Sequence, residues 1–478
     1  MKRILKVAWE ENEYDTVDFN DERLEKRAVN LLKRFSAEPE SPINQVCLNW
    51  AETKAAYRFF KNQKITTSSL LAPHIAKTDE RAKQYKKILA IQDTTFFNYT
   101  THRSTGGLGN IGRRGSDPNS PKGLIMHTVF AVTLEGLPLG ILNQRIYLRT
   151  LRKRASKEGS KLRFSAKDKE SYKWVEGLIN SNYHLEYSEC TPITVCDREG
   201  DFYDMFELAH ILKSSVIIRA QHDRMVLMEQ RPGLQTYQKS EKRLWKTMKS
   251  QRCRGVLCVE IPSRGGELGS NPRIAQLELR YSKIKILPPQ GHVNKAILNK
   301  AILYVIYVTE RNTPSGETPL EWMLITNITI RTFEDAAEKV KWYSFRFRIE
   351  TLHRILKSGF LVENCRLGTA ESLTRYLTLM SVAAWRIFWI TMIGRVSPNT
   401  PCTSFLSDSE WKVLYAKVYQ THNFPAHPIS THKAIHLIGR LGGFLDRKSD
   451  GEPGVTSLWR GWRRLNDLAD GWDISTAA

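Results

Sequence analysis

Two short apolar runs, each leading to an aspartate, constrain the fold of this chain most. Residues 88–91 lead to Asp93, and residues 192–196 lead to Asp197. A helical pattern and then a strand pattern over residues 216–219 follow the second run. Strand, helix, strand in this order predicts an α/β fold, in which ligands bind at the carboxyl ends of the strands. We therefore expect both aspartates to close their strands at one edge of a central sheet.

The remaining chain changes its pattern several times. The first 70 residues are helical by the spacing of their apolar residues, with basic residues between them. Strand patterns over 124–133 and 137–147 are joined by a Glu135-Gly136 turn, which predicts a β-meander. Further candidates lie at 255–261, 274–281, 302–309 and 322–325, within a strand-rich interval from about 221 to 329, and helical patterns return at 332–358, 369–393 and 456–468.

The charge of the chain points to a polyanionic partner. Its 72 Lys and Arg against 50 Asp and Glu leave a net charge of +22. An ordinary basic protein and one that binds an anionic membrane surface are the alternatives. The residues at 112–123 have the composition of a loop, and the dense basic run at 149–169 is either a solvated segment or a loop that follows phosphates. The first 70 residues suit docking on DNA, and an ordinary amphipathic helix pair fits them equally well.

Cysteine usage and hydropathy exclude several classes of protein. Seven cysteines without a C-x-x-C pair exclude a zinc ribbon and a disulfide scaffold, so a reducing compartment is expected. The N-terminus reaches acidic residues before an apolar stretch, which argues against a secretion signal. The most apolar run, 373–393, is interrupted by Arg375 and Arg386. We expect a buried helix there and no transmembrane segment.

Glu350 adds a third acid to the two aspartates. It lies in the helical pattern 332–358, and three carboxylates on a sheet edge and a neighbouring helix would hold two divalent cations about 4 Å apart, an arrangement suited to phosphoryl transfer. Taken singly, each acid has an ordinary explanation. An aspartate after a strand is commonly a turn or helix cap, and a glutamate in a charged helix is commonly solvated.

The residues around Glu350 form the pattern Y-x2-R-x3-E-x6-K, made by Tyr343, Arg346, Glu350 and Lys357. In one continuous helix these offsets place all four on one face. An acid flanked by Arg, Lys and Tyr has the character of a metal ligand surrounded by phosphate contacts. A salt-bridged surface helix is the alternative.

These motifs together resemble the DDE transposases of the insertion-sequence-four family. The resemblance rests on Asp93-Thr94-Thr95, on Cys196-Asp197-Arg198-Glu199 and on the Tyr343 to Lys357 pattern. It extends to Tyr57-Arg58-Phe59, to the segment Gly316-Glu317-Thr318-Pro319-Leu320-Glu321-Trp322 and to Gly439-Arg440-Leu441-Gly442-Gly443-Phe444, and so covers nearly the whole chain.

The resemblance implies a fold and a chemistry. The fold would be an RNase H-like mixed sheet core with a β insertion. Asp93, Asp197 and Glu350 would bind two Mg²⁺ ions, with Mn²⁺ as a substitute, and would cleave DNA at the element's ends, pass through a hairpin and join the 3′ ends to target DNA. Trp322 would stack on a flipped base, and Tyr343, Arg346 and Lys357 would hold phosphates. Arg219 is a weaker DNA-contact candidate, with a surface salt bridge as its alternative.

The resemblance also implies a domain order and partners. Residues 1–70 would bind the DNA ends, 71–370 would form the catalytic core interrupted at about 221–330, and 371–478 would dimerise, with Leu458, Trp459 and Trp462 at the interface. The partners would be double-stranded DNA and a second copy of the chain, in the bacterial cytoplasm at the nucleoid. A non-catalytic end-binding protein and an RNase H-like nuclease without strand transfer are the competing interpretations.

One histidine pair stands outside this scheme. His432 and His436 are four residues apart and would chelate a metal if helical. No glutamate stands beside the first histidine, and Pro425 and Pro428 disrupt the approach from the preceding histidines. We therefore expect surface or core histidines here.

Overall fold

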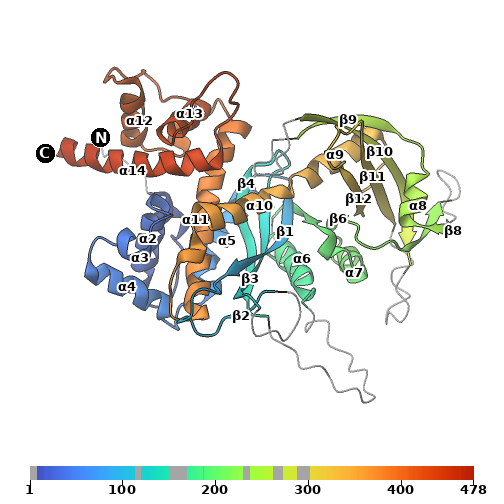
Figure 1. The fold of residues 1–478 in the computed structure, drawn as a ribbon, viewed down its shortest axis with the longest axis horizontal. Coiled ribbons are helices and arrows are strands. Elements are labelled where there is room, and N and C mark those ends of the chain that lie inside the picture. The colour runs from blue at the N-terminus through green and yellow to red at the C-terminus, as the bar shows by residue number, and fades with distance from the viewer. Residues whose placement is uncertain are drawn as a thin grey trace, which may run out of the picture. The chain divides into compact units, whose positions relative to one another are not determined.

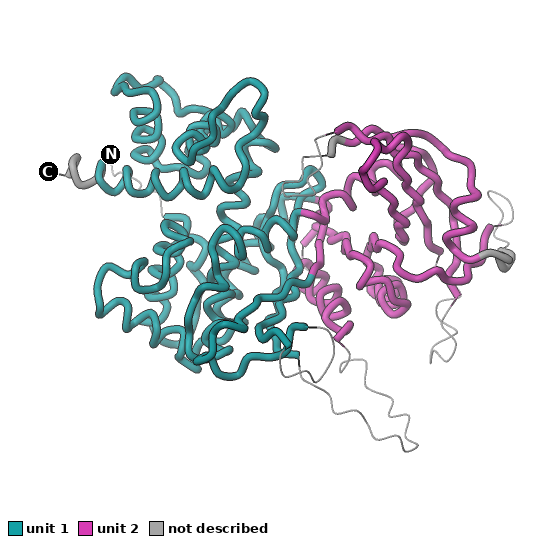
Figure 2. The backbone as a smooth tube through the Cα atoms, viewed as in Figure 1, with its two compact units in different colours: residues 1–85, 94–160, 348–478 teal, residues 86–93, 161–347 magenta. Residues whose placement is uncertain are grey.

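The aspartate-bearing runs form neighbouring parallel strands in the computed structural model of this chain. The structure describes residues 8–112, 120–149, 170–186, 188–229, 237–261, 273–287 and 302–477. They belong to two units: unit 1 comprises residues 1–85, 94–160 and 348–478, and unit 2 comprises 86–93 and 161–347 (Figure 2). The mixture of sheet and helix confirms the α/β class, with helices in the N-terminal and C-terminal parts of the chain (Figure 1).

In unit 2 the parallel strands are the first part of β1 (Lys87–Asn98), β5 (Thr191–Cys196) and β6 (Ser215–Arg219). Ile91 is in register with Val195, and Val195 with Ile217. The expected helix between β5 and β6 is present as α7 (Tyr203–Ile211), so the strand–helix–strand prediction is confirmed.

The strand-rich interval is also confirmed, and its strands extend the same sheet. The strand β12 pairs antiparallel with β6, β11 with β12, and β10 with β11, while β9 and β7 both pair with β10, and β8 pairs with β7. The bounds are β7 (Met225–Glu229), β8 (Tyr237–Arg243), β9 (Gly255–Ile261), β10 (Arg273–Ile286), β11 (Leu303–Arg311) and β12 (Glu321–Thr326), with helices α6 (Tyr172–His184), α8 (Leu244–Lys249) and α9 (Phe333–Ser344).

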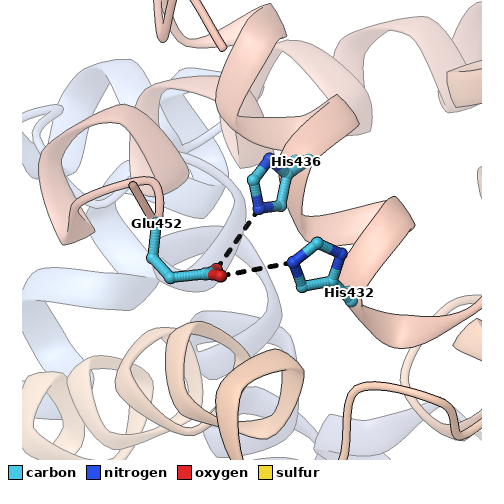
Figure 3. Close-up of side chains that lie close together, drawn as sticks. All are labelled: His432, His436 and Glu452. Carbon is cyan, nitrogen blue, oxygen red and sulfur yellow. Dashed lines mark hydrogen bonds and ion pairs between the residues drawn. The ribbon is translucent and has the colours of Figure 1, made fainter. Parts of the chain in front are cut away.

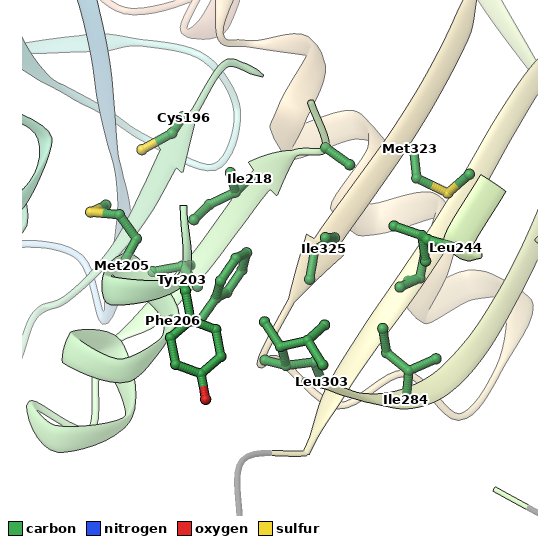
Figure 4. Packing of buried hydrophobic residues seen from close by; sticks show 14 of the residues in the cluster. Cys196, Tyr203, Met205, Phe206, Ile218, Leu244, Ile284, Leu303, Met323 and Ile325 are labelled. Atoms are coloured by element: carbon green, nitrogen blue, oxygen red, sulfur yellow. The ribbon is translucent and has the colours of Figure 1, made fainter. Parts of the chain in front are cut away.

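The core of unit 2 holds this sheet and its helices together. Met205 and Phe206 of α7 belong to one buried cluster with Ile218 of β6, Ile325 of β12 and Leu244 of α8 (Figure 4). Each such side chain contributes about 1.5–3 kcal/mol when it is fully buried. The ends of β5 and β6 are therefore held in place by packing from both α7 and the antiparallel strands.

Strand β1 is longer than expected. The apolar run was expected to close at Asp93, but β1 continues to Asn98, so that expectation is wrong and Asp93 lies inside a strand. The residues that follow Asp93 are Thr, Thr, Phe and Phe, all of which favour extended backbone. In unit 1, Phe97 and Tyr99 are buried, and the Tyr99 N–H donates to the Lys122 carbonyl at 2.8 Å.

Unit 1 contains the expected meander. Strands β3 (Lys122–Val132) and β4 (Pro138–Tyr147) pair antiparallel through a turn in which Gly136 has φ of 96°. The short strand β2 (Gly109–Asn110) also pairs with β3. Residues 113–119 of the expected loop and 150–169 of the basic run lie outside the described residues.

Helices make up most of the rest of unit 1. Those in its described residues are α1 (Trp9–Glu13), α2 (Glu22–Ala37), α3 (Ile43–Val46), α4 (Trp50–Lys61), α5 (Thr67–Ala82), α10 (Phe347–Arg354), α11 (Ala370–Val396), α12 (Asp408–Tyr419), α13 (Thr431–Leu441) and α14 (Val455–Ala477), with short 3-10 or π turns between some of them. The helices expected near the N-terminus and at 369–393 and 456–468 are confirmed.

Helix α11 is the core helix of unit 1. It is long and apolar enough to cross a membrane by length and composition alone, but 89% of its apolar stretch is buried inside the protein. Arg375 donates to the carbonyls of Ile65 and Phe60 at 2.6 and 3.0 Å, which satisfies its charge within the core. Arg386 lies over the Trp389 ring at 4.8 Å. The two arginines are thus compatible with the expected buried helix.

Leu458, Trp459 and Trp462 of α14 pack within the chain itself. Each is at most 6% exposed. The Trp459 indole N–H donates to Glu40 at 2.7 Å. These three side chains contribute to the core of unit 1, and the dimerisation expected of the C-terminal helices stays a prediction.

The segment 333–359 is not the single helix that was expected. Helix α9 ends at Ser344, a turn follows, and α10 begins at Phe347 and runs into a π turn, η4 (Ile355–Gly359). In the turn, the N–H groups of Phe345 and Arg346 donate to carbonyls three residues earlier. Neither Pro nor Gly marks this break, so local sequence gives no sign of it. The four residues of the Y-x2-R-x3-E-x6-K pattern therefore do not share one continuous helix.

Candidate active site

Asp93 and Asp197 lie at the same level of adjacent strands. Each is two residues beyond the paired residues Ile91 and Val195 of the parallel strands β1 and β5. Both carboxylates act on the buried Cys196 thiol, whose pKa is raised well above its ordinary value by burial and then by these two charges. The structure therefore brings the two sequence-predicted aspartates together in unit 2.

Asp197 is a half-buried carboxylate that accepts a hydrogen bond from its own turn. It caps the 3-10 helix η2 (Arg198–Gly200), and its Oδ1 accepts from the Glu199 N–H at 2.8 Å. Burial raises the pKa of Asp197 and the Glu199 charge adds to this, whereas the Glu199 N–H, Arg346 and Lys173 lower it. Burial outweighs the positive groups around this carboxylate, so a cation bound here would stabilise its ionised form.

Arg346 brings a guanidinium to Asp93. Its Nη1 lies 3.8 Å from Asp93 Oδ2, and the two side chains are 20% and 16% exposed. This separation is long for a charge-assisted hydrogen bond. Arg346 comes from the turn between α9 and α10, so the break in the expected helix places a guanidinium beside the aspartates.

Tyr343, Trp322 and Arg219 form a second group in unit 2. The Tyr343 ring packs edge-on against Trp322 with centroids 5.3 Å apart, and Tyr343 is 3% exposed while Trp322 is half-buried. Arg219 donates to the Glu321 carbonyl at 2.9 Å. Burial lowers the pKa of Arg219, and Tyr343 partly raises it again. Burial raises the pKa of Tyr343, and Arg219 is one of the groups that lower it.

Glu350 and Lys357 belong to unit 1. Glu350 is exposed in the first turn of α10, four residues after Arg346. Lys357 lies in the π turn η4, with its Nζ 5.6 Å from the centre of the Phe97 ring. Burial lowers the pKa of Lys357, and the charge of Glu363 raises it. Both residues lie on the segment 333–359, Glu350 in α10 and Lys357 in the π turn that follows, instead of in one continuous helix.

Two regions of the chain match known families. Residues 6–65 match the family described as transposase DNA-binding, and residues 382–476 match the family described as transposase Tn5 dimerisation domain. The chain belongs to the Tn5-like transposases. Family membership implies a DNA transposition enzyme of a metal-dependent family. The residues from Asp93 to Lys357 lie between the two matched regions.

Sequence reasoning about this transposase missed Lys173. It lies in α6 of unit 2, is 5% exposed, and its Nζ is 3.4 Å from Glu199 Oε2. The positive charge of Lys173 lowers the pKa of Asp197. Glu199 was part of the Cys196 to Glu199 motif and signalled an acid near Asp197, but no sequence feature distinguishes Lys173 from the many other lysines of the chain.

Proposed function

We propose that this chain is a cut-and-paste DNA transposase whose active site consists of Asp93, Asp197 and Glu350. The observation that supports this most is the placement of Asp93 and Asp197 at one level of two parallel strands, with Arg346 beside them. Carboxylate oxygens are the ligands that Mg²⁺ prefers, and the burial of Asp197 favours a bound cation. The two aspartates therefore fit a divalent metal site.

The strand order supports an RNase H-like core. In unit 1, β3 and β4 form an antiparallel meander, and in unit 2, β5 and β6 lie parallel to the first part of β1. An antiparallel meander and a set of parallel strands are the elements that the RNase H-like proposal requires. The strands β7 to β12 then form the β insertion between Asp197 and Glu350.

Chain connectivity supports Glu350 as the third carboxylate. Arg346 lies 3.8 Å from Asp93, and Glu350 follows Arg346 by four residues, all of them in α10. At 1.5 Å per helical residue, the backbone advances only about 6 Å over this distance. Glu350 is an exposed residue in the first turn of α10, as a ligand of an active-site metal can be.

The proposed reaction is a series of in-line displacements at phosphorus. Two Mg²⁺ ions, or Mn²⁺ in their place, would activate the attacking oxygen and stabilise the leaving one. Asp93, Asp197 and Glu350 would hold the ions, and Arg346, Tyr343 and Lys357 would hold phosphates of the DNA end. Water attacks the phosphodiester at the end of the element, and the freed 3′-hydroxyl attacks the opposite strand to close a hairpin. Hairpin opening and joining to target DNA reuse the same residues.

Trp322 is proposed as the stacking partner of a flipped base. Its ring is half-buried and is supported edge-on by Tyr343 at 5.3 Å. A supported but partly exposed aromatic ring is suited to stacking a base. Arg219, at the end of β6, adds a guanidinium to the same group, where it contacts the DNA backbone.

The flanking regions supply the partners. We propose that residues 1–70 bind the transposon ends, that 71–370 form the core interrupted at about 221–330, and that 371–478 mediate a homodimer that pairs two ends in the bacterial cytoplasm. In the N-terminal region, Leu48 and Trp50 are 78% and 69% exposed, and Lys54 lies over the Trp50 ring. Exposed aromatic and basic residues there suit contact with DNA.

The test is cleavage of a labelled duplex that carries the element's own terminal repeat. We expect the wild type to give nicked and hairpin products with Mg²⁺ and none with EDTA, and Asp197→Asn to give none with either. The matched control is Asp204→Asn, which changes an exposed aspartate of α7 and should cleave as the wild type does. Binding without cleavage by the wild type would favour an end-binding protein, and nicking without hairpin or joining would favour a plain nuclease.

A further inference from the structure

A second cluster of metal-ligating side chains lies in unit 1, within the region that matches the dimerisation domain. His432 and His436 project from α13 one turn apart, and Glu452 faces both from the loop that precedes α14 (Figure 3). The His432 Nε2 is 3.2 Å from Glu452 Oε1, and the His436 Nε2 is 3.3 Å from Glu452 Oε2. Both histidines are partly exposed, in keeping with the surface or core histidines that the sequence predicts, and α13 and the returning loop bring them together with an acid that the sequence did not predict.

The two histidine–carboxylate distances are those expected around a tetrahedral ion, and the three ligand atoms all lie within 4.8 Å of one another. With metal–ligand distances of about 2.0–2.1 Å, neighbouring ligand atoms of a tetrahedral zinc site lie about 3.3 Å apart. Two imidazoles and one carboxylate form a ligand set typical of zinc and related transition metals and unlike the all-oxygen sets of Mg²⁺. We propose that His432, His436 and Glu452 bind a divalent transition metal of the Zn²⁺ class, with water as the fourth ligand.

The hydrogen bonds of His436 support this proposal. Its Nδ1 is 2.7 Å from Asp446 Oδ1, while its Nε2 faces Glu452. A carboxylate behind a histidine is the usual support of a metal ligand. Asp446 therefore holds the His436 ring in an orientation that directs its Nε2 at Glu452.

The surroundings leave access for an ion. The side chains of His432 and Glu452 are 45% and 38% exposed, and that of His436 is 16% exposed. Arg395 feels the charge of Glu452, and its guanidinium donates to the Pro453 carbonyl at 3.0 Å. Two carboxylates, Asp446 and Glu452, thus face the histidines.

The site has a structural consequence that is separate from the chemistry at Asp93 and Asp197. It joins α13 to the loop between α13 and α14, where Asp446, with φ of 57°, and Gly451, with φ of 64°, adopt left-handed backbone. This backbone is unstrained at Gly451 but carries an energetic cost at Asp446, which has a side chain. A metal at the three ligands would fix this loop and with it the start of α14.

The test uses untagged, full-length protein freed of metal with EDTA. Zinc is titrated by calorimetry, and Co²⁺ is titrated by its visible absorption. We expect the wild type to bind one more equivalent of zinc than the double variant His432→Ala/His436→Ala, and only the wild type to give an intense tetrahedral Co²⁺ spectrum. The matched control is His427→Ala, which removes an exposed histidine of the preceding loop and should bind as the wild type does.

A second variant keeps the ligands in place. Asp446→Asn should weaken zinc binding by about 10–100-fold, the usual effect of removing a carboxylate behind a ligating histidine. Zinc should also raise the melting temperature of the wild type but not of the double variant. Equal zinc stoichiometry in the wild type and the double variant would overturn the proposal, as would a His436 imidazolium that persists unchanged in excess zinc by ¹⁵N NMR.

Discussion

The strand-borne aspartates and the segment 333–359 differ in how their positions are determined. Asp93 and Asp197 are positioned by the register of β1 and β5, in which Lys87 to Ile91 pair residue by residue with Thr191 to Val195. The segment 333–359 changes from α-helix to turn, to α-helix and to π turn within 27 residues. The strand register sets the positions of the two aspartates, and the apolar runs that form these strands can be recognised in the sequence. The helix ends and turns of the segment 333–359 instead depend on the tertiary contacts of each part.

This difference has a functional consequence. The aspartates form the rigid part of the proposed site, and the turn after α9 brings Arg346 to Asp93. Changes at the acids should therefore abolish the reaction, while changes in the segment should affect individual steps. The following experiments test this contrast, from the largest expected effect to the smallest.

Glu350→Gln is the strongest test, because it asks whether the segment supplies a ligand as essential as the aspartates. We expect cleavage to fall by roughly 10³-fold or more, as when a group that stabilises transition-state charge is removed, with end binding nearly unchanged. Glu334→Gln, an exposed glutamate in the first turn of α9, is the matched control. Cleavage by Glu350→Gln at the wild-type rate would remove Glu350 from the site and leave the aspartates alone.

Arg346→Ala should have an intermediate effect. If Arg346 contacts a phosphate of the DNA end, its loss should weaken end binding and reduce the slope of log affinity against log salt by about 1. Lys341→Ala, an exposed lysine of α9, should change neither quantity. An unchanged slope together with reduced Mg²⁺ affinity would show that Arg346 acts only on Asp93.

Trp322→Ala should separate two steps of the reaction. Base stacking on an aromatic ring contributes about 1–3 kcal/mol, so hairpin formation should fall by roughly 10-fold or more while first-strand nicking continues. Trp322→Phe should keep most of the hairpin activity. Equal loss of nicking and hairpin in Trp322→Ala would exclude the stacking role and indicate that Trp322 supports the fold beside Tyr343.

The smallest expected effect is a difference in the rate of amide hydrogen exchange between the aspartate-bearing strand β1 and the segment 333–359. The amides of residues 89–91 lie in the buried parallel part of β1 and should exchange slowly. Those of Phe345 to Phe347 lie in the turn between helices and should exchange faster. Similar protection in both regions would mean that the segment is as firmly held as the sheet.

Much of the fold was predictable because it follows local pattern. The meander, the strand–helix–strand unit and the strand-rich interval all have periodic apolar residues or turn signals. The extent of β1 beyond Asp93 was not predictable in the same way, because polar Thr94 and Thr95 interrupt the apolar run and the strand continues by pairing elsewhere in unit 1. The pairing of Asp93 with Asp197 follows from the parallel order of their strands.

The parts that escaped prediction depend on tertiary contacts. The turn at Phe345 and Arg346 contains no helix-breaking residue, so the Arg346 to Asp93 contact has no local signal. Buried Lys173 looks like any other lysine in the sequence. Glu452 lies 16 residues after His436, beyond a loop with left-handed backbone at Asp446 and Gly451, and nothing in the spacing predicts that it returns to the histidines.

The central claim, that Glu350 shares a metal site with Asp93 and Asp197, can be tested by iron-directed cleavage of the protein. Fe²⁺ replaces Mg²⁺ in the purified transposase, ascorbate and peroxide are added, and the fragments are mapped by mass spectrometry. We expect cuts near residues 93, 197 and 350 that excess Mg²⁺ suppresses together and that Asp197→Asn abolishes. Cuts near 93 and 197 without any near 350 would contradict the claim.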